Sequence, residues 1–113
     1  MRILILGGNG MIGHKMYQKL SLEYNDTCVT LRKNLNAYNY KSIYNQKNVI
    51  DNFDLTNFVQ LKAKLDELKP NIIINACGIT IRRGIENLIS NTIILNSVLP
   101  HFLNEWVIEN NQR

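Results

Sequence analysis

The sequence predicts an α/β fold in which a parallel β-sheet is covered by helices. Three observations lead to this prediction: short apolar runs alternate with segments of helical periodicity, closely spaced glycines follow the first apolar run, and 45% of the residues are apolar. The apolar fraction indicates a folded chain, and 113 residues are enough for one domain with a modest core. We therefore expect residues 1–113 to form one domain.

The first half of the chain is expected to supply two strands and one helix. Residues 2–6 form a continuous apolar run, which is typical of a strand buried on both faces. Residues 11–24 carry apolar side chains at four-residue spacing, which predicts a helix. Its buried stripe is expected to consist of Ile12, Met16, Leu20 and Tyr24. Residues 27–32 predict a second strand because they are rich in β-branched side chains, whereas residues 33–46 lack a clear period and predict a poor helix or an ordered loop.

A third strand and the clearest helix are expected next. The short strand is predicted near residues 48–50. The helix is predicted over residues 56–70, where Thr56 or Asn57 can cap its start and Pro70 ends it. Its apolar face is expected to consist of Phe58, Leu61, Leu65 and Leu68.

The last part of the chain predicts a fourth strand and a long helix. Residues 71–76 read as a buried strand, residues 77–85 as a loop, and residues 86–110 as a helix. Pro100 falls inside this helix and cannot donate a hydrogen bond to the carbonyl of Asn96, so it should bend or loosen the helix. Strands that alternate with helices imply right-handed crossovers and a parallel sheet. The predicted strand order is 3-2-1-4, which is half of a doubly wound, Rossmann-type fold.

Closely spaced glycines between the first strand and the first helix predict a nucleotide site. Ligands of doubly wound sheets bind at the carboxyl ends of the strands, beside the first strand. Gly7 can form the tight turn, Gly10 leaves room for a diphosphate, and Gly13 lets the helix pack closely on the sheet. The amides and the dipole of the helix N-terminus favour an anion there. The alternative is a glycine turn that binds no ligand.

The residues after the second strand bear on the choice of nucleotide. Sites for NAD usually carry an acidic residue at the end of this strand, whereas the chain has Arg32 and Lys33 there. Two cations suit a 2′-phosphate, and an arginine can bind it through two hydrogen bonds. We therefore favour NADP over NAD as the cofactor. In the alternative interpretation, both side chains are simply solvated at a strand end.

Two further strand ends contribute candidate residues. Asp54 and Leu55 follow the third strand, where Asp54 could accept a hydrogen bond from an adenine amino group or instead cap the next helix. Ala76, Cys77 and Gly78 follow the fourth strand, and their small size would let a cofactor pass over its end. Cys77 has no neighbouring base in the sequence, so we interpret it as a packing residue and not as a nucleophile.

Composition disfavours several other classes of function. The net charge of +4 is spread along the chain, so a nucleic-acid surface is not expected. No apolar run approaches the ~20 residues that span a bilayer, and we expect no membrane partner. Cys28 and Cys77 stand far apart without a CxxC pair, which favours a reducing, cytoplasmic location and argues against a disulfide framework or a metal site.

Four segments of the chain carry a resemblance to a known family: GGNGMIG (residues 7–13), DLT (54–56), NACG (75–78) and LNSVLPHFLNEW (95–106). In this order and spacing they resemble extended short-chain dehydrogenases/reductases of the NAD-dependent epimerase/dehydratase superfamily. The resemblance is strongest to the dTDP-4-dehydrorhamnose reductase-like branch and covers essentially the whole chain. It implies reduction, epimerisation or dehydration of a nucleotide sugar with NAD(P)H, in polysaccharide biosynthesis.

The resemblance also implies roles for individual residues. Gly10, Met11 and Ile12 would contact the diphosphate, and the residue at position 32 would meet the adenosine ribose or its phosphate. Asp54 and Leu55 would flank the adenine, residues 76–78 would line the path to the nicotinamide ribose, and Asn96 would face the active site. The full set of expected cofactor-binding residues is Gly7, Asn9, Gly10, Met11, Ile12, Gly13, Arg32, Lys33, Asp54, Leu55, Ala76, Cys77, Gly78 and Asn96.

The catalytic residues of the family are not expected within this chain. The family's Ser/Thr and Tyr-x-x-x-Lys follow the next strand, and none of the five tyrosines here has a lysine four residues later. We therefore expect an amino-terminal part of such an enzyme, which lacks the catalytic residues and the domain that binds the nucleotide sugar. A noncatalytic nucleotide-binding or regulatory module and an inert fragment are the alternatives. The long helix takes part in dimer packing in many relatives, so a homo-oligomer is also expected.

Overall fold

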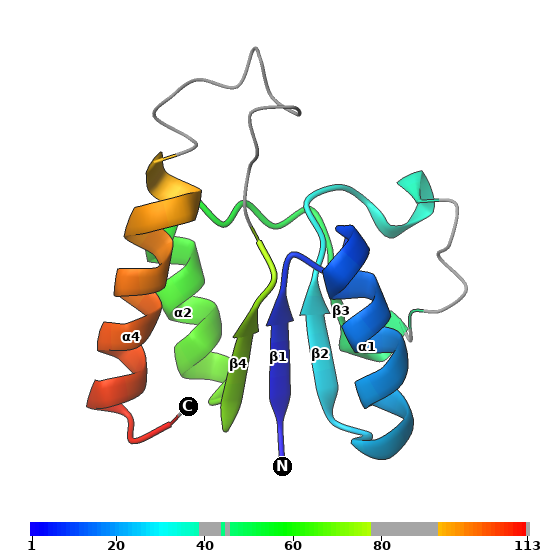
Figure 1. Ribbon diagram of the computed structural model, residues 1–113, viewed down its shortest axis with the longest axis horizontal. Coiled ribbons are helices and arrows are strands. Elements are labelled where there is room, and N and C mark those ends of the chain that lie inside the picture. The colour runs from blue at the N-terminus through cyan, green and yellow to red at the C-terminus, as the bar shows by residue number, and fades with distance from the viewer. Residues whose placement is uncertain (39–43, 45, 78–92, 113) are drawn as a thin grey trace.

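The computed structural model describes residues 1–38, 44, 46–77 and 93–112, which form one four-stranded sheet with helices on both faces (Figure 1). The strands are β1 (Ile3–Leu6), β2 (Thr27–Thr30), β3 (Val49–Ile50) and β4 (Ile72–Asn75). All three neighbouring pairs are parallel, and the spatial order is β3-β2-β1-β4. The predicted strand order and the Rossmann-type fold class are therefore confirmed.

Within the described residues, three α-helices and several short turns accompany these strands. The α-helices are α1 (Met11–Glu23), α2 (Phe58–Leu68) and α4 (Leu99–Glu109). Single 3₁₀ turns, η1 (Leu35–Ala37) and η3 (Gln46–Asn48), lie in the segment after β2, for which a poor helix or a loop was expected. Among the described residues, no helix is long and apolar enough to cross a membrane.

The sheet separates two hydrophobic clusters. Along β1, Leu4 and Leu6 belong to the cluster that α2 and α4 cover, whereas Ile3 and Ile5 belong to the cluster that α1 covers. Figure 1 shows α1 on the other side of the strands from α2 and α4. Successive side chains of a strand point to opposite faces, so this continuous apolar run fills both clusters at once, as a buried parallel strand requires.

The buried face of α1 differs from the predicted stripe. Ile12 is 68% exposed and Tyr24 is 36% exposed, so the prediction was wrong at both ends of the stripe. The fully buried positions are Gly13 and Tyr17. With about 3.6 residues per turn, a strict four-residue spacing drifts by roughly 40° at each step, so it cannot follow one face through the whole helix.

Helix α2 agrees with its prediction and resolves the choice of cap. Asn57 caps the helix, because its side-chain oxygen accepts a hydrogen bond from the backbone N–H of Gln60 at 3.1 Å. Leu61 and Leu65 are fully buried. At the other end, Lys69 adopts the left-handed conformation directly before Pro70, and the helix ends there.

The helix before the C-terminus is loosened as predicted. Its described part begins with a π-helical turn, η4 (Ile94–Val98), in which the N–H of Leu99 donates to the carbonyl of Ile94. Pro100 lacks the N–H for a regular α-helical bond to Asn96, and a wider turn precedes it. Residues 86–92 of the predicted helix lie outside the described residues.

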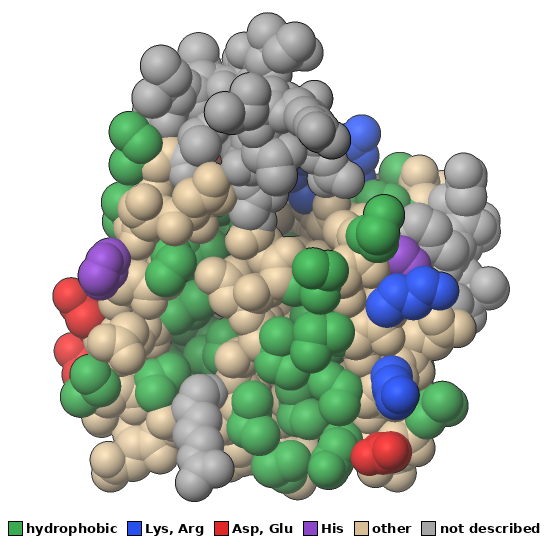
Figure 2. All heavy atoms as spheres, in the orientation of Figure 1, with side chains coloured by type: hydrophobic (Ala, Val, Ile, Leu, Met, Phe, Trp, Pro, Cys, Tyr) green, Lys and Arg blue, Asp and Glu red, His purple; other side chains and the backbone are tan. Residues whose placement is uncertain are grey.

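Strand β4 is less buried than predicted. Ile72, Ile73 and Ile74 are half-buried, and Asn75 is exposed. Among the described strands β4 has only β1 as a neighbour and therefore lies at an edge of the sheet. Figure 2 shows hydrophobic side chains gathered on the face between α1 and β4.

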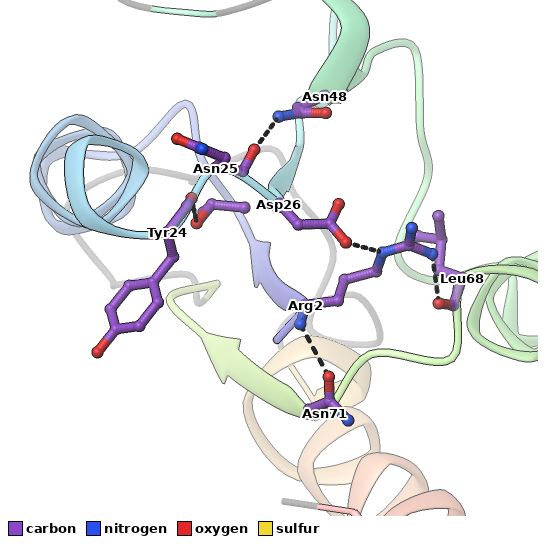
Figure 3. Close-up of polar contacts among 8 residues, drawn as sticks. Arg2, Tyr24, Asn25, Asp26, Asn48, Leu68 and Asn71 are labelled. Atoms are coloured by element: carbon purple, nitrogen blue, oxygen red, sulfur yellow. Dashed lines mark hydrogen bonds and ion pairs between the residues drawn. The ribbon is translucent and has the colours of Figure 1, made fainter.

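Arg2 joins three segments at the amino ends of the strands (Figure 3). Its backbone N–H donates to Asn71 Oδ1 at 2.8 Å, its Nε donates to Asp26 Oδ2 at 3.0 Å, and its Nη1 donates to the carbonyl of Leu68 at 2.6 Å. These bonds tie β1 to the turn before β2 and to the end of α2. They hold the end of the sheet opposite to the glycine loop.

Candidate functional site

The candidate site begins with the turn that leaves β1 at the carboxyl end of the sheet. Gly7 has a φ of +81°, in the left-handed region that favours glycine. A β-carbon at this position would also lie 3.0 Å from the Cα of Cys77 and 3.1 Å from the backbone of Ala76. The turn at Gly7 is therefore tight, as expected, and it packs directly against the end of β4.

Gly8 and Gly13 are required by packing. A β-carbon at position 8 would overlap the side chain of Val29, and a β-carbon at position 13 would overlap the carbonyl oxygen of Gly7. The sequence predicted that Gly13 lets α1 pack closely on the sheet. In the structure Gly13 instead packs against the loop residues Gly7 and Gly8. No role was predicted for Gly8, because its contact is to a residue on another strand.

Gly10 differs from the other three glycines that the structure describes. Its φ is −81°, which any residue adopts, and a β-carbon there would meet only the carbonyl oxygen of Gly7 at an ordinary 3.6 Å. Neither backbone conformation nor packing against the described residues requires glycine at this position. A ligand that lies against the loop could therefore occupy the open space beside Gly10.

The start of α1 presents backbone amides beside this open space. Gly10 is the N-cap residue, and no side chain caps the helix within the part of the chain that the structure describes. Met11 and Ile12 are exposed, and the first turn contains no acidic residue. The first N–H groups of a helix have no intrahelical acceptor, and the helix dipole makes this end partly positive. The arrangement therefore suits an anionic group.

Two residues outside the glycine pattern hold the loop in place. Thr30, the last residue of β2, accepts the Gly7 N–H through its hydroxyl at 3.1 Å and the Gly8 N–H through its carbonyl at 2.8 Å. Tyr44 donates its hydroxyl to the Gly8 carbonyl at 2.6 Å. Neither residue is predicted from the sequence pattern. The end of a strand beside the loop could have pointed to Thr30, whereas no sequence signal points to Tyr44.

Arg32 and Lys33 follow β2 and are both exposed. The backbone N–H of Lys33 donates to the hydroxyl of Tyr38 at 2.9 Å. Because β2, β1 and β4 are parallel, the residues that follow β2 and β4 lie at the same edge of the sheet. Both side chains are therefore accessible to an anionic ligand from solvent.

The end of β4 supplies Ala76 and Cys77. The Ala76 N–H donates to the carbonyl of Leu6 at 2.9 Å, and the Cys77 N–H donates to Asn75 Oδ1 at 3.1 Å. Burial raises the pKa of the Cys77 thiol more than Arg32 lowers it, so the thiol stays protonated. A protonated thiol fits a packing role better than a nucleophilic one. Gly78 lies outside the described residues.

Asp54 and Leu55 follow β3, and Asn96 lies on η4. The exposed carboxylate of Asp54 accepts hydrogen bonds from the N–H and the hydroxyl of Thr56, at 2.9 and 2.7 Å. It closes the turn before α2, while Asn57 caps that helix. Leu55 packs against the cluster covered by α2 and α4, and Asn96 is exposed on η4. In Figure 1 the orange turn η4 lies at the same end of the molecule as the carboxyl ends of the strands.

The described residues offer little for other chemistry. They contain no group of three or more His, Cys, Asp or Glu side chains that could hold a metal ion. His14 places its Nδ1 2.8 Å from the carbonyl of Gly10, at the base of the loop. The space beside Gly10, the open amides and the two exposed cations together fit a ligand with phosphate groups.

Comparison with known proteins agrees with this geometry. The model of the NAD dependent epimerase/dehydratase family matches residues 3–103. No curated protein matches the chain. The L-threonine 3-dehydrogenase of Trypanosoma brucei is 19% identical, with a TM-score of 0.82, over 99% of this chain and 34% of the dehydrogenase.

Two further solved structures share the fold. A hypothetical dTDP-4-dehydrorhamnose reductase from Sulfolobus tokodaii is 21% identical, with a TM-score of 0.71, over 99% of this chain and 37% of that one. The dTDP-glucose 4,6-dehydratase of Bacillus anthracis, solved in complex with NAD, is 24% identical, with a TM-score of 0.65, over 96% of this chain and 34% of that one. The chain therefore spans about a third of the length of these structures.

Proposed function

The chain belongs to the NAD-dependent epimerase/dehydratase family, and from this premise we propose that it is the cofactor-binding part of an NAD(P)-dependent sugar-nucleotide oxidoreductase. A nicotinamide dinucleotide fits both the family and the glycine loop at the carboxyl end of β1. When bound, such a cofactor supplies or accepts a hydride. The residues described above would bind and orient it.

The observation that carries this proposal is the open position at Gly10. The φ and the surroundings of Gly10 would accept an alanine, so the described residues give no internal reason for glycine. A diphosphate that lies against the backbone does give such a reason, because a β-carbon would hold it away from the amides at the start of α1. Gly10, Met11 and Ile12 are therefore the proposed diphosphate contacts.

We favour NADP over NAD for the reason that β2 leads into Arg32 and Lys33. Both side chains are exposed at the edge where the adenosine ribose would lie, and no acidic residue stands at the end of this strand to bind ribose hydroxyls. A guanidinium can bind a 2′-phosphate through two hydrogen bonds. Asp54 and Leu55 are proposed neighbours of the adenine, and residues 76–78 and Asn96 are proposed neighbours of the nicotinamide half.

A nucleotide-sugar substrate is the finer part of this proposal, since the chain spans about a third of the length of the solved structures it resembles. The dTDP-4-dehydrorhamnose reductase and dTDP-glucose 4,6-dehydratase among the structural neighbours favour a nucleotide sugar, whereas the L-threonine 3-dehydrogenase has the same fold and a different substrate. A nucleotide-binding module without catalysis is the second candidate, because the glycine loop and the exposed cations suit a nucleotide whether or not a reaction follows.

Location and assembly form part of the same proposal. Cys28 and Cys77 are both free thiols, which suits a cytoplasmic protein. Helix α4 and the turn before it leave Val98 and Ile108 exposed, which suits association of two copies through this helix. Light scattering after size-exclusion chromatography would measure the mass in solution, and a monomer at all concentrations would contradict the association.

Calorimetric titration with NADP⁺ and NAD⁺ tests the cofactor proposal. Circular dichroism first establishes that the protein is folded, because an unfolded chain would give a false negative result. We expect binding of both nucleotides with a preference for NADP⁺, and we expect inorganic diphosphate to compete with each. A folded protein that binds neither nucleotide would overturn the proposal in favour of an inert fragment.

A further inference from the structure

Tyr44 contacts the glycine loop from a segment that is distant in the sequence. Its hydroxyl donates to the carbonyl of Gly8 at 2.6 Å, across 36 positions of the chain, and the tyrosine is only 6% exposed. Its ring packs against the ring of Tyr17 on α1, with the ring centroids 5.3 Å apart and the planes tilted by 37°. The hydroxyl is therefore held in position by the packing of its own ring.

The loop that Tyr44 contacts needs an external anchor. Four glycines between positions 7 and 13 leave the backbone with wide conformational freedom, and ordering it costs more entropy than ordering other residues. Both backbone groups of Gly8 are nevertheless engaged, since its N–H donates to the carbonyl of Thr30 at 2.8 Å and its carbonyl accepts from Tyr44. The bond from Tyr44 completes the restraint on this residue.

Restraint of the Gly8 carbonyl fixes the orientation of the next peptide group. A trans peptide is planar, and its N–H points opposite to its carbonyl. With the Gly8 carbonyl directed at Tyr44, the N–H of Asn9 must point to the other side of the loop. The Gly10 N–H donates to the Gly7 carbonyl at 3.2 Å, so the fixed peptide leads directly into the cap of α1.

We propose that Tyr44 is a positioning residue for dinucleotide binding, because its buried hydroxyl holds the Gly8–Asn9 peptide in the orientation that receives the diphosphate. This inference rests on the function proposed above. Without the hydroxyl, the loop would also adopt other orientations of this peptide. The apparent affinity then falls by the fraction of molecules that keep the competent orientation.

The substitution Tyr44→Phe removes the hydroxyl and keeps the ring packed on Tyr17. The matched control is Tyr24→Phe, which removes an exposed hydroxyl at the far end of α1. The probes are NADP⁺ and NAD⁺, which carry the diphosphate, and adenosine, which lacks it. Calorimetry measures the dinucleotides, and saturation-transfer NMR measures adenosine.

We expect Tyr44→Phe to weaken both dinucleotides about tenfold while adenosine binding changes by less than about twofold, and we expect Tyr24→Phe to change neither. A purely structural role for Tyr44 would weaken all three ligands together. Equal loss for adenosine and the dinucleotides, or no loss at all, would overturn the positioning role and leave the proposed function intact. Absence of dinucleotide binding by the folded wild-type protein would overturn both.

A measurement on the wild-type protein covers the case in which Tyr44→Phe does not fold. A buried hydroxyl that donates to a carbonyl exchanges slowly with water and gives its own proton resonance. We expect this resonance of Tyr44 to be present and to shift when NADP⁺ binds. A Tyr44 hydroxyl that exchanges freely, or that does not respond to the nucleotide, would contradict the positioning role.

Discussion

Gly13 touches Gly7 so closely that a β-carbon on Gly13 would overlap the carbonyl oxygen of Gly7. The same β-carbon would lie 3.0 Å from the Cα of Gly8. All of these atoms belong to the backbone, so no side-chain rotation can relieve the overlap. This contact sets the distance between the first turn of α1 and the end of β1, and therefore the shape of the loop between them.

We expect Gly13→Ala to destabilise the fold. Alanine is favoured over glycine in a helix by about 1 kcal/mol. Overpacking costs typically about 1–3 kcal/mol, and the overlap here is with backbone that cannot move freely. With the overpacking cost in the upper part of that range, about 2–3 kcal/mol, the net loss in the free energy of unfolding should be about 1–2 kcal/mol, measured by urea denaturation.

The matched control for this prediction is Gly10→Ala. A β-carbon at Gly10 meets only ordinary contacts, so the loss of stability should stay below about 1 kcal/mol, the usual effect of alanine at an N-cap. If the two alanine variants lost equal stability, the packing role assigned to Gly13 would be wrong.

Gly10→Val should abolish dinucleotide binding with little effect on folding. The backbone of Gly10 is extended, at φ −81° and ψ 169°, which suits valine, but the branched side chain would occupy the space proposed for the diphosphate. We expect calorimetry to detect no binding of NADP⁺ or NAD⁺ by this variant. Unchanged affinity would mean that the ligand binds elsewhere.

Arg32→Glu should weaken NADP⁺ binding more than NAD⁺ binding. The substitution replaces a cation that can bind a 2′-phosphate through two hydrogen bonds with an anion that repels it. We expect a loss of about tenfold or more for NADP⁺ and less than about threefold for NAD⁺. Lys19→Glu, the same change of charge on an exposed position of α1, serves as the control. Equal losses for the two nucleotides would remove the preference for NADP.

The stability of the contact between α2 and α4 should depend on pH through Asp66. Hydrogen bonds from Lys62 Nζ at 2.7 Å and from Trp106 Nε1 at 2.9 Å lower the pKa of this carboxyl. Because the folded pKa lies below the unfolded one, the contribution is complete above the unfolded value of about 3.9 and is lost as the pH falls through the folded pKa.

Comparison with Asp66→Asn would isolate this contribution. Asparagine keeps an acceptor for Trp106 but does not titrate, so the difference in unfolding free energy between the variant and the wild type should shrink below about pH 4. Urea denaturation between pH 6 and pH 2.5, followed by Trp106 fluorescence, would measure it. A difference that stays constant with pH would show that Asp66 does not act through its charge.

The sequence by itself determined the strand order and the position of the glycine loop, and it limited the cap of α2 to Thr56 or Asn57. These follow from local rules, because a continuous apolar run must be buried on both faces and Asn57 is only three residues from the amide that it caps. Gly7 directly follows β1, and Ala76 and Cys77 directly follow β4. The carboxyl ends of neighbouring parallel strands lie at one edge of the sheet, so the sequence also predicted that these residues lie together.

Only the tertiary structure decided which residues shape that loop. Gly8 and Gly13 are held by atoms of Val29 and Gly7, and the loop is anchored by Thr30 and Tyr44. The same holds for the buried ring of Tyr17 on α1, which packs against the ring of Tyr44. Such contacts join residues that are far apart in the chain. A sequence pattern over a few neighbouring positions therefore cannot predict them.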